Sequence, residues 1–318
     1  MKILNTLRMH YQTGCLFVAL IALLVLWLRP VTLQKRPVYN VTIIVDITRS
    51  MNATDYQVND QAISRLEYVK KTLRQLITQL PCESTVGLGL FTERRSTLLF
   101  EPLDVCQSYA EIDAALSHID WRMAWAADSN IAKGLLSTVD MLQKSGSAII
   151  FITDGQEAPP INPSYHTDFS ALKGKVNGMI IGAGGLQAVP IPKFDQQGKA
   201  VGFYAQDDVP HRSTFGQSNL DPSQIEGYNA RNAPFGSSAA KGTEHLTALH
   251  ETYLQQLAAE SGLTYARLTD LETLQHNLQS PSFALEKPVL ADARWQPALL
   301  ALMMLVCVYW PRCLSLRK

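Results

Sequence analysis

Two long apolar runs lie near the ends of the chain, and shorter patterned segments lie between them. Residues 15–28 are apolar throughout and follow Lys2 and Arg8. With the two residues that precede it, this run approaches the roughly 17 residues that a membrane-spanning helix needs. It ends in the sequence WLRP, which lacks the small residues of a signal-peptide cleavage site. We therefore predict an uncleaved signal anchor within residues 1–30.

The second apolar run, residues 295–311, is shorter, so a buried core helix is its alternative interpretation. Trp295 and Trp310 are typical of the membrane interface, and the basic tail at 312–318 favours the cytoplasmic side. Basic residues outside both runs predict a two-pass protein of the cytoplasmic (inner) membrane. Residues 31–294 would then lie across the membrane, which is the periplasm in a Gram-negative bacterium.

Strand-like and helix-like patterns alternate between the two runs. Val41 to Asp46 is a short segment rich in Val and Ile, typical of a buried strand in a parallel sheet. Apolar residues at spacings of three and four predict a helix over residues 61–80. The alternation predicts an α/β fold with a doubly wound, mostly parallel, Rossmann-like sheet. Further strands are expected at 84–92, 97–103, 148–153, 176–183 and 264–268, and further helices after the Ser108–Glu111 capping box, after Ser129, at 244–261 and after Asp270.

Residues 84–92 and 97–103 form a predicted hairpin with the polar turn 93–96, which would supply one antiparallel edge strand. A hairpin centred there pairs residues whose numbers sum to about 188, and Cys82 and Cys106 satisfy this sum. The other three cysteines belong to the apolar end runs or the tail. We predict a Cys82–Cys106 disulfide, which fits an oxidising compartment. Two free thiols are the alternative.

Composition restricts the classes of function. The chain has 318 residues, enough for one large domain or two small ones. Its 28 basic and 28 acidic residues cancel, and no basic patch stands out. Nucleic acid is therefore not an expected partner.

Oxygen-bearing side chains follow the first predicted strand at alternate positions, namely Asp46, Thr48 and Ser50. In open α/β sheets, ligands bind beyond the carboxyl ends of the strands. A carboxylate with two hydroxyls provides hard oxygen donors, which suit Mg²⁺, Mn²⁺ or Ca²⁺ better than Zn²⁺. An ordinary polar turn is the alternative.

Three elements of the sequence together resemble the von Willebrand factor type A family. They are Asp46-Ile47-Thr48-Arg49-Ser50, the loop residue Ser129 and the strand-end residue Asp154. The metal-ion-dependent adhesion site (MIDAS) of that family has the pattern D-x-S-x-S, a loop hydroxyl that is usually Thr, and a later Asp. Thr48 and Ser129 depart from the commonest residues but keep a hydroxyl. The resemblance implies a divalent cation, Mg²⁺ first and Ca²⁺ or Mn²⁺ as alternatives. Thr48 and Ser50 would bind it directly, joined by Ser129 in some states, and Asp46 and Asp154 would act largely through water.

The resemblance covers residues 38–275, with an insertion at 187–241 and a linker at 276–294. The insertion begins with a predicted hairpin around residues 195–198, in a PIP-x-x-D-x-x-G sequence. This hairpin, and the sequence LQQLAAESGLTYARL at 254–268, resemble the Bat-type membrane-anchored proteins of bacteria. Residues 207–241 match nothing in that pattern, and we expect a surface loop there.

The resemblance implies a non-enzymatic protein that docks a partner protein, whose carboxylate completes the coordination of the metal. The sequence VDITRSMN at 45–52 and the two apolar runs resemble the A-domain accessory proteins (Mxa-type) of the calcium- and quinone-dependent methanol dehydrogenase. A Bat-type stress-tolerance protein, working with other A-domain proteins or a MoxR-type ATPase, is the alternative. A hydrolase or phosphatase using Asp46 and Asp154 is a third. An aspartyl phosphotransferase would carry a second Asp where Thr48 stands.

Overall fold

The computed structural model describes residues 2–126, 128–158, 167–195, 197–209, 243 and 245–315. The chain divides into two compact units. One unit comprises Pro37–Leu285, and the other combines Met1–Arg36 with Glu286–Lys318. The larger unit holds all the predicted site residues, so most of the description concerns that domain.

The core of the domain is a sheet in the strand order β12-β7-β6-β1-β4-β5. All neighbouring strands run parallel except β5, which is antiparallel to β4 at one edge. The predicted fold class, a mostly parallel sheet with one antiparallel edge strand, is confirmed. The strands are β1 (Val31–Asp46), β4 (Thr85–Thr92), β5 (Arg95–Asp104), β6 (Ala148–Thr153), β7 (Gly178–Gly182) and β12 (Thr264–Arg267).

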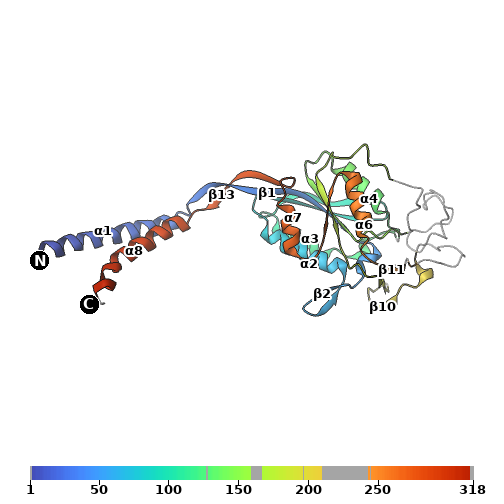
Figure 1. Cartoon of the computed structure of the whole chain (residues 1–318), viewed down its shortest axis with the longest axis horizontal. Coiled ribbons are helices and arrows are strands. Elements are labelled where there is room, and N and C mark those ends of the chain that lie inside the picture. The colour runs from blue at the N-terminus through green and yellow to red at the C-terminus, as the bar shows by residue number, and fades with distance from the viewer. Residues whose placement is uncertain are drawn as a thin grey trace. The chain divides into compact units, whose positions relative to one another are not determined.

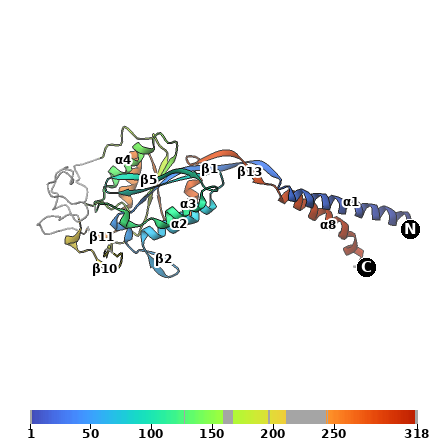
Figure 2. The same cartoon turned by 180° about the vertical axis from the view of Figure 1, so that it is seen from behind.

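Helices cover both faces of this sheet (Figure 1). Helices α2 (Arg65–Gln79), α3 (Tyr109–His118) and α7 (Leu271–Leu278) pack on the face that carries Ile43 and Val45. Helices α4 (Ile131–Leu142) and α6 (Glu251–Ser261) pack on the opposite face with Ile44. Because side chains alternate along a strand, a continuous apolar run is needed to bury both faces. Figure 2 shows the same division, with α4 across the sheet from α2 and α3.

Two helices begin later than their sequence patterns predict. Residues Gln61–Ile63 form strand β3, paired with β2 (Tyr56–Val58), and α2 begins only after Ser64. The side chain of Ser64 caps α2 by accepting from the backbone N–H of Glu67. The predicted start at residue 61 was therefore wrong, because a tight β-hairpin competes with the first helical turn.

The helix predicted over 244–261 begins at Glu251 instead. Leu246–Thr247 forms the short strand β11, which pairs with β8 (Val189–Pro190) at the base of the insertion. Helical spacing of apolar residues could not reveal this, since the pairing partner lies more than fifty residues earlier in the chain.

The predicted disulfide is confirmed. Strands β4 and β5 form the hairpin, and Cys82 and Cys106 lie at its open end with their Cα atoms 5.3 Å apart. This separation is within the range that a disulfide can bridge without backbone movement. The capping box predicted at Ser108 is wrong in detail, because the Ser108 side chain makes no capping hydrogen bond at the start of α3. Asp104 instead accepts from the backbone N–H groups of Cys106 and Gln107.

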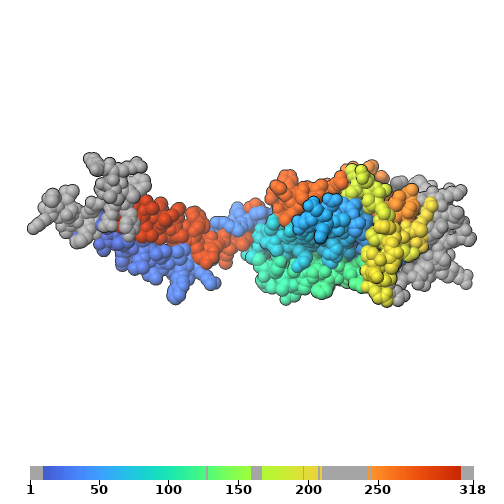
Figure 3. Space-filling view, turned by 90° about the horizontal axis from the view of Figure 1, so that it is seen from below, coloured from blue at the N-terminus to red at the C-terminus, as the bar shows by residue number. Residues whose placement is uncertain are grey.

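The predicted insertion hairpin is present as β9 (Pro192–Phe194) and β10 (Ala200–Phe203). Asp195 stabilises its turn by accepting from the backbone N–H groups of Gln197 and Lys199. Figure 3 shows this yellow segment beside a blue segment from the early part of the domain. The short helix η1 (Arg49–Asn52) follows β1 in that part of the chain. Most of the predicted 207–241 loop lies outside the described residues.

The smaller unit contains α1 (Lys2–Trp27), α8 (Trp295–Ser315) and the strand β13 (Ala284–Asp292), which pairs with β1. Within α1, residues His10–Trp27 are long and apolar enough to cross a membrane. In α8 the apolar stretch among the described residues is Trp295–Val308, which is shorter than such a span. Strand β13 lies in the 276–294 segment that was expected to be a linker.

Candidate functional site

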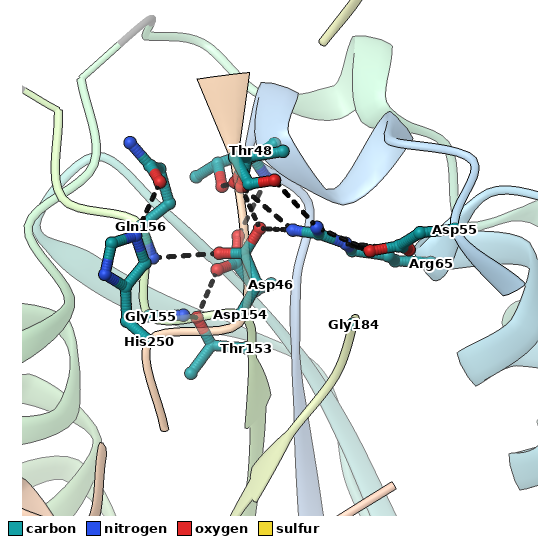
Figure 4. Close-up of polar contacts among 12 residues, drawn as sticks. Asp46, Thr48, Asp55, Arg65, Thr153, Asp154, Gly155, Gln156, Gly184 and His250 are labelled. Carbon is teal, nitrogen blue, oxygen red and sulfur yellow. Dashed lines mark hydrogen bonds and ion pairs between the residues drawn. The ribbon is translucent and has the colours of Figure 1, made fainter. Parts of the chain in front are cut away.

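The predicted site residues lie at the carboxyl edge of the sheet, where the chain changes direction across it. From β1 the chain first adds β4 on one side and later adds β6 on the other. Asp46 ends β1, and Asp154 follows directly after β6, so two adjacent strands present carboxylates at this point (Figure 4). Such switch points are where open α/β sheets bind ligands.

The loop after β1 folds around the Asp46 carboxylate. Its Oδ1 accepts from the backbone N–H of Thr48 at 2.8 Å, and its Oδ2 accepts from Thr153 Oγ1 at 2.6 Å. Helix η1 begins at the next residue, Arg49, and this turn brings Ser50 Oγ to 3.3 Å from Thr48 Oγ1. Asp46, Thr48 and Ser50 are all buried. Both oxygens of Asp46 are thus occupied by donors, whereas the two hydroxyls share only one long contact.

Asp154 is also bonded through both of its carboxylate oxygens. Oδ1 accepts from the backbone N–H of Gln156 at 2.9 Å, and Oδ2 accepts from Arg65 Nη1 at 2.6 Å. The hydroxyl of Thr247 lies 3.3 Å from the same Oδ2. The Asp154 side chain is fully buried, and its partner Arg65 is fully buried as well. Asp154 is therefore one end of a buried ion pair.

Arg65 was not singled out by its sequence, because a charged residue in the first turn of a helix is usually exposed. Its guanidinium also bonds Asp55, with Nη2 at 2.7 Å and Nε at 3.0 Å from Oδ2. Thr247 accepts from Nη1 through Oγ1 at 2.9 Å. Arg65 thereby joins the loop after η1, the end of β6 and strand β11 in one polar cluster (Figure 4).

Ser129 lies at the same edge of the sheet, in the loop before α4. Its backbone N–H donates to the carbonyl of Ala158 at 2.7 Å, and the next N–H, of Asn130, donates to Glu93 at 2.6 Å. Its Oγ is buried and makes no hydrogen bond to any described residue. The structure therefore places Ser129 between the ends of β4 and β6 without bonding it to the other four predicted residues. An unsatisfied buried hydroxyl is uncommon and calls for an explanation such as a ligand.

Glu157 is a second residue that the sequence analysis missed. Its Oε1 accepts from Tyr253 Oη at 2.6 Å and from the backbone N–H groups of Ile131 and Ala132 at the start of α4. Its Oε2 is buried without a hydrogen-bond partner among the described residues. The sequence offered one indication of its role, namely that Glu157 lies three residues after Asp154. Its position beside the N-terminus of α4 became visible only in the structure.

Burial changes the acidity of two carboxyls at this edge. Burial first, and then the neighbouring charge of Asp154, raise the pKa of the Asp46 carboxyl to about 7, against hydrogen bonds from Thr153 and Thr48 that lower it. Burial likewise raises the pKa of Glu157 to about 8, although its hydrogen bonds from Tyr253 and α4 oppose the change. Both pKa values are raised mainly because burial disfavours the ionised carboxylate, and a nearby cation would favour that ionised form.

The donor set fits a hard divalent cation. Among the five predicted residues, the oxygens without strong protein partners are the hydroxyls of Thr48, Ser50 and Ser129, while both Asp carboxylates are already bonded. A cation there would be bound directly by hydroxyls and reached by Asp46 and Asp154 through water. In the part of the chain that the structure describes, no group of three or more His, Cys, Asp or Glu side chains could hold a metal. A site that depends on hydroxyls does not require such a group.

The insertion hairpin forms one rim of the site. The guanidinium of Arg49, which belongs to the site loop, lies 5.1 Å from the ring centre of Tyr204, just after β10. Trp121 stacks on Phe194 of β9 with ring centres 5.3 Å apart. The hairpin is thus attached to η1 and to the loop before α4, and a partner that reached the site would also meet these side chains.

Comparison with known proteins agrees with this architecture. Residues 41–156 match the family model described as von Willebrand factor type A domain. No curated protein matches the chain.

Several solved structures are similar to the chain. An aerotolerance-related membrane protein from Bacteroides fragilis is 19% identical, with 76% of this chain and 97% of that chain covered and a TM-score of 0.48. An uncharacterized membrane-spanning protein from Vibrio fischeri is 17% identical, with coverage of 76% and 96% and a TM-score of 0.28. A von Willebrand factor type A protein from Catenulispora acidiphila is 13% identical, with coverage of 77% and 42% and a TM-score of 0.39. The family match, over residues 41–156, lies within the α/β domain, and the observed order of strands and helices agrees with it.

Proposed function

We propose that this chain is a non-enzymatic, membrane-anchored protein whose A-domain docks a partner protein through a divalent cation. The cation, Mg²⁺ first and Ca²⁺ or Mn²⁺ as alternatives, would be held by Asp46, Thr48, Ser50, Ser129 and Asp154. A carboxylate of the partner would complete the coordination. Because hydroxyls are neutral ligands and the carboxylates act through water, the ion would keep enough positive charge to attract that carboxylate.

The observation that carries this proposal is that the buried carboxylates have protein hydrogen-bond donors whereas a buried hydroxyl beside them has none in the part of the chain that the structure describes. The carboxylates of Asp46 and Asp154 are bonded by protein donors, while Ser129 Oγ is buried without a hydrogen-bond partner among the described residues. A buried hydroxyl without a partner costs stability unless a ligand uses it. The side chains are recessed, so the partner would have to present its carboxylate on a side chain that reaches past Arg49 and Tyr204.

We propose a two-pass topology with the A-domain in the periplasm. The support is the apolar helix His10–Trp27, the basic tail after α8, and the Cys82–Cys106 disulfide, which fits an oxidising compartment. The test is a cysteine placed at the exposed turn residue Asp60. In intact cells, Asp60→Cys should react with a membrane-impermeant maleimide, and reaction only after lysis would contradict this topology.

The proposed role of the docking is that of an accessory or assembly factor for a periplasmic enzyme such as a calcium- and quinone-dependent methanol dehydrogenase. A Bat-type stress-tolerance protein, working with a MoxR-type ATPase, is the alternative. The hairpin β9–β10 favours the alternative, because it forms at the place where the Bat-type sequence pattern predicts it. The identity of the captured partner decides between these two roles.

The test is a crosslinked pull-down of the full chain from membranes, in Mg²⁺ and in chelator, with the partner identified by mass spectrometry. Asp46→Ala and Ser50→Ala should reduce partner recovery at least tenfold (about 1.4 kcal/mol), while leaving the membrane level of the protein similar to wild type. Ser117→Ala is the matched control, since Ser117 is half-buried and its side-chain hydrogen bonds lie within α3, away from the site. Equal recovery from both site variants, with no effect of chelator, would contradict the proposal.

A further inference from the structure

We propose that Arg65 sets the cation affinity of the site, by holding Asp154 away from direct coordination and by lowering the net negative charge around the ion. This inference rests on the proposed cation site. It assigns to Arg65 the role of a positioning residue, and it explains why a fully buried guanidinium lies beside a carboxylate of that site.

All three nitrogens of the Arg65 guanidinium donate hydrogen bonds. Nη1 donates to Asp154 Oδ2 at 2.6 Å and to Thr247 Oγ1 at 2.9 Å. Nη2 donates to Asp55 Oδ2 at 2.7 Å and to the Thr247 carbonyl at 3.3 Å, and Nε donates to Asp55. An arginine held this way by two carboxylates and a threonine has one orientation, so its charge stays fixed next to Asp154.

The surrounding backbone is shaped to accept this side chain. Gly184 follows β7 with a φ of +131°, and a Cβ at this position would lie 2.7 Å from Arg65 Nε. The next residue, Gly185, donates its N–H to Asp55 Oδ2 at 2.8 Å and accepts from Leu249. Two glycines therefore leave room for the guanidinium and secure its second carboxylate partner. The ends of β6, β7 and β11 all contribute to holding Arg65.

The geometry determines how Asp154 can act on an ion. Arg65 Nη1 and the Gln156 N–H each take one lone pair of Asp154, on different oxygens. The guanidinium charge also weakens the attraction of this carboxylate for a second cation, so Asp154 would meet the ion through a water molecule. Removal of the guanidinium would release Oδ2, apart from the longer contact with Thr247. Asp154 could then coordinate the ion directly and with its full charge, and direct carboxylate ligands raise the affinity for divalent cations.

The charges lead to the same expectation. Asp46, Asp55 and Asp154 contribute three negative charges to the buried cluster when ionised, and Arg65 is the positive charge bonded to two of them. Two negative charges remain, which a single divalent cation balances. Removing Arg65 increases the negative charge that attracts the cation, whereas removing the Asp55 charge decreases it. In a buried site, an added charge a few ångströms away changes ion affinity strongly.

A structural role and an affinity-setting role make opposite predictions for the same substitution. If Arg65 only supports the fold, its loss loosens the cluster and weakens cation binding. If Arg65 sets the affinity, its loss strengthens cation binding even though the metal-free domain becomes less stable. The sign of the change in affinity therefore discriminates between the two roles.

The experiment measures Mn²⁺ binding to the full chain in detergent at pH 8, by electron paramagnetic resonance of the free ion and by competition with Mg²⁺. Arg65→Met should bind Mn²⁺ roughly tenfold more tightly than wild type or better, and Asp55→Asn should bind it several-fold more weakly. The double variant, Arg65→Met with Asp55→Asn, should lie between wild type and Arg65→Met, because Arg65 bonds Asp154 directly and Asp55 does not. Arg74→Met is the matched control, since Arg74 lies on the same helix but pairs with Asp113 at the surface.

Each outcome decides the question. Tighter binding by the folded Arg65→Met variant, with unchanged binding by Arg74→Met, supports the proposal. If the folded Arg65→Met variant binds Mn²⁺ as wild type does, or more weakly, the proposal is wrong. If Arg65→Met does not fold, the double variant is compared with wild type instead, and equal or weaker binding contradicts the proposal in the same way. Unchanged binding by Asp55→Asn overturns it as well, whichever of the other variants folds. If wild type and Asp46→Ala both fail to bind Mn²⁺, the proposed function fails first. If wild type binds Mn²⁺ and Asp46→Ala does not, the cation site is present. The remaining variants then test the role of Arg65 alone.

Discussion

The two ends of the central sheet are held together by different kinds of contact. At the amino end of β1 and β4, the Cys82–Cys106 disulfide closes the β4–β5 hairpin, and hydrogen bonds of hydroxyls and of the half-buried Asp104 add to it. Thr42 Oγ1 and Ser147 Oγ, for example, lie 2.7 Å apart and buried. At the carboxyl end, buried charges connect the segments instead, through Arg65 and its two carboxylates.

The difference follows from what each end has to do. Covalent and neutral contacts keep their strength when pH or ionic conditions change. Buried charges respond to pH, to ions and to each other, because an unpaired charge in a low-dielectric interior is costly. We therefore expect the stability of the amino end to depend little on pH and ions, and that of the carboxyl end to change when a ligand binds.

The largest effect should come from Arg65→Met in chelator. This change leaves Asp55 and Asp154 buried without their cationic partner, so we expect a loss of about 3–5 kcal/mol in the free energy of unfolding. Arg74→Met removes a largely exposed pair and should cost less than about 1 kcal/mol. Denaturant unfolding of the two variants measures both values. Similar losses would show that the buried cluster is no more important than a surface pair.

The next effect should come from the amino end. Replacing Cys82 and Cys106 together by alanine opens a loop with a sequence separation of 24 and should cost about 2–4 kcal/mol. Cation binding should stay within a factor of about 2, since the disulfide lies at the opposite end of the strands from the site. Unfolding curves and Mn²⁺ titrations of the same preparation check both statements. A large loss of cation affinity would contradict the separation of the two ends.

The third effect concerns pH. The folded-state pKa of Glu157, about 8, lies above its ordinary value of 4.5. The folded state therefore binds the proton more tightly, and this stabilisation is complete below about pH 4.5 and is lost as the pH rises through about 8. Glu157→Gln should flatten the fall in metal-free stability between pH 5 and 8 by roughly 2 kcal/mol. Unfolding measured in chelator across this range gives the dependence of the free energy of unfolding on pH. If Glu157→Gln leaves that dependence unchanged, Glu157 does not gain a proton on folding.

The smallest effect on stability should come from Ser129→Ala. The hydroxyl of Ser129 makes no hydrogen bond to any residue that the structure describes, so the free energy of unfolding should change by less than about 0.5 kcal/mol. The control is Ser96→Ala, where a buried hydroxyl accepts from Thr138 at 2.7 Å and about 1 kcal/mol should be lost. Mn²⁺ affinity should fall only for Ser129→Ala. A stability loss for Ser129→Ala equal to that of Ser96→Ala would mean that its hydroxyl has a structural partner.

The sequence pattern predicted the sheet well because its strands are buried on both faces. Residues such as Ile43 and Ile44 must both be apolar, which makes the strand recognisable without any partner. The disulfide was predictable for a similar local reason, since the pairing in a hairpin follows from its turn. The starts of α2 and α6 were not predictable, because the strands β3 and β11 that precede them form through pairing that apolar spacing does not encode.

The alternation of strands and helices, and the oxygen-bearing residues at the ends of β1 and β6, can be recognised from short segments of the chain. The burial of Arg65 between Asp55 and Asp154 cannot be recognised in this way, because nothing in its own segment distinguishes this arginine from an exposed one. The energetic character of an ionisable side chain depends on its burial and on partners far away in sequence. For Arg65 those partners include Asp154 and Thr247, which meet it only when β6, β11 and α2 have assembled around the carboxyl edge of the sheet.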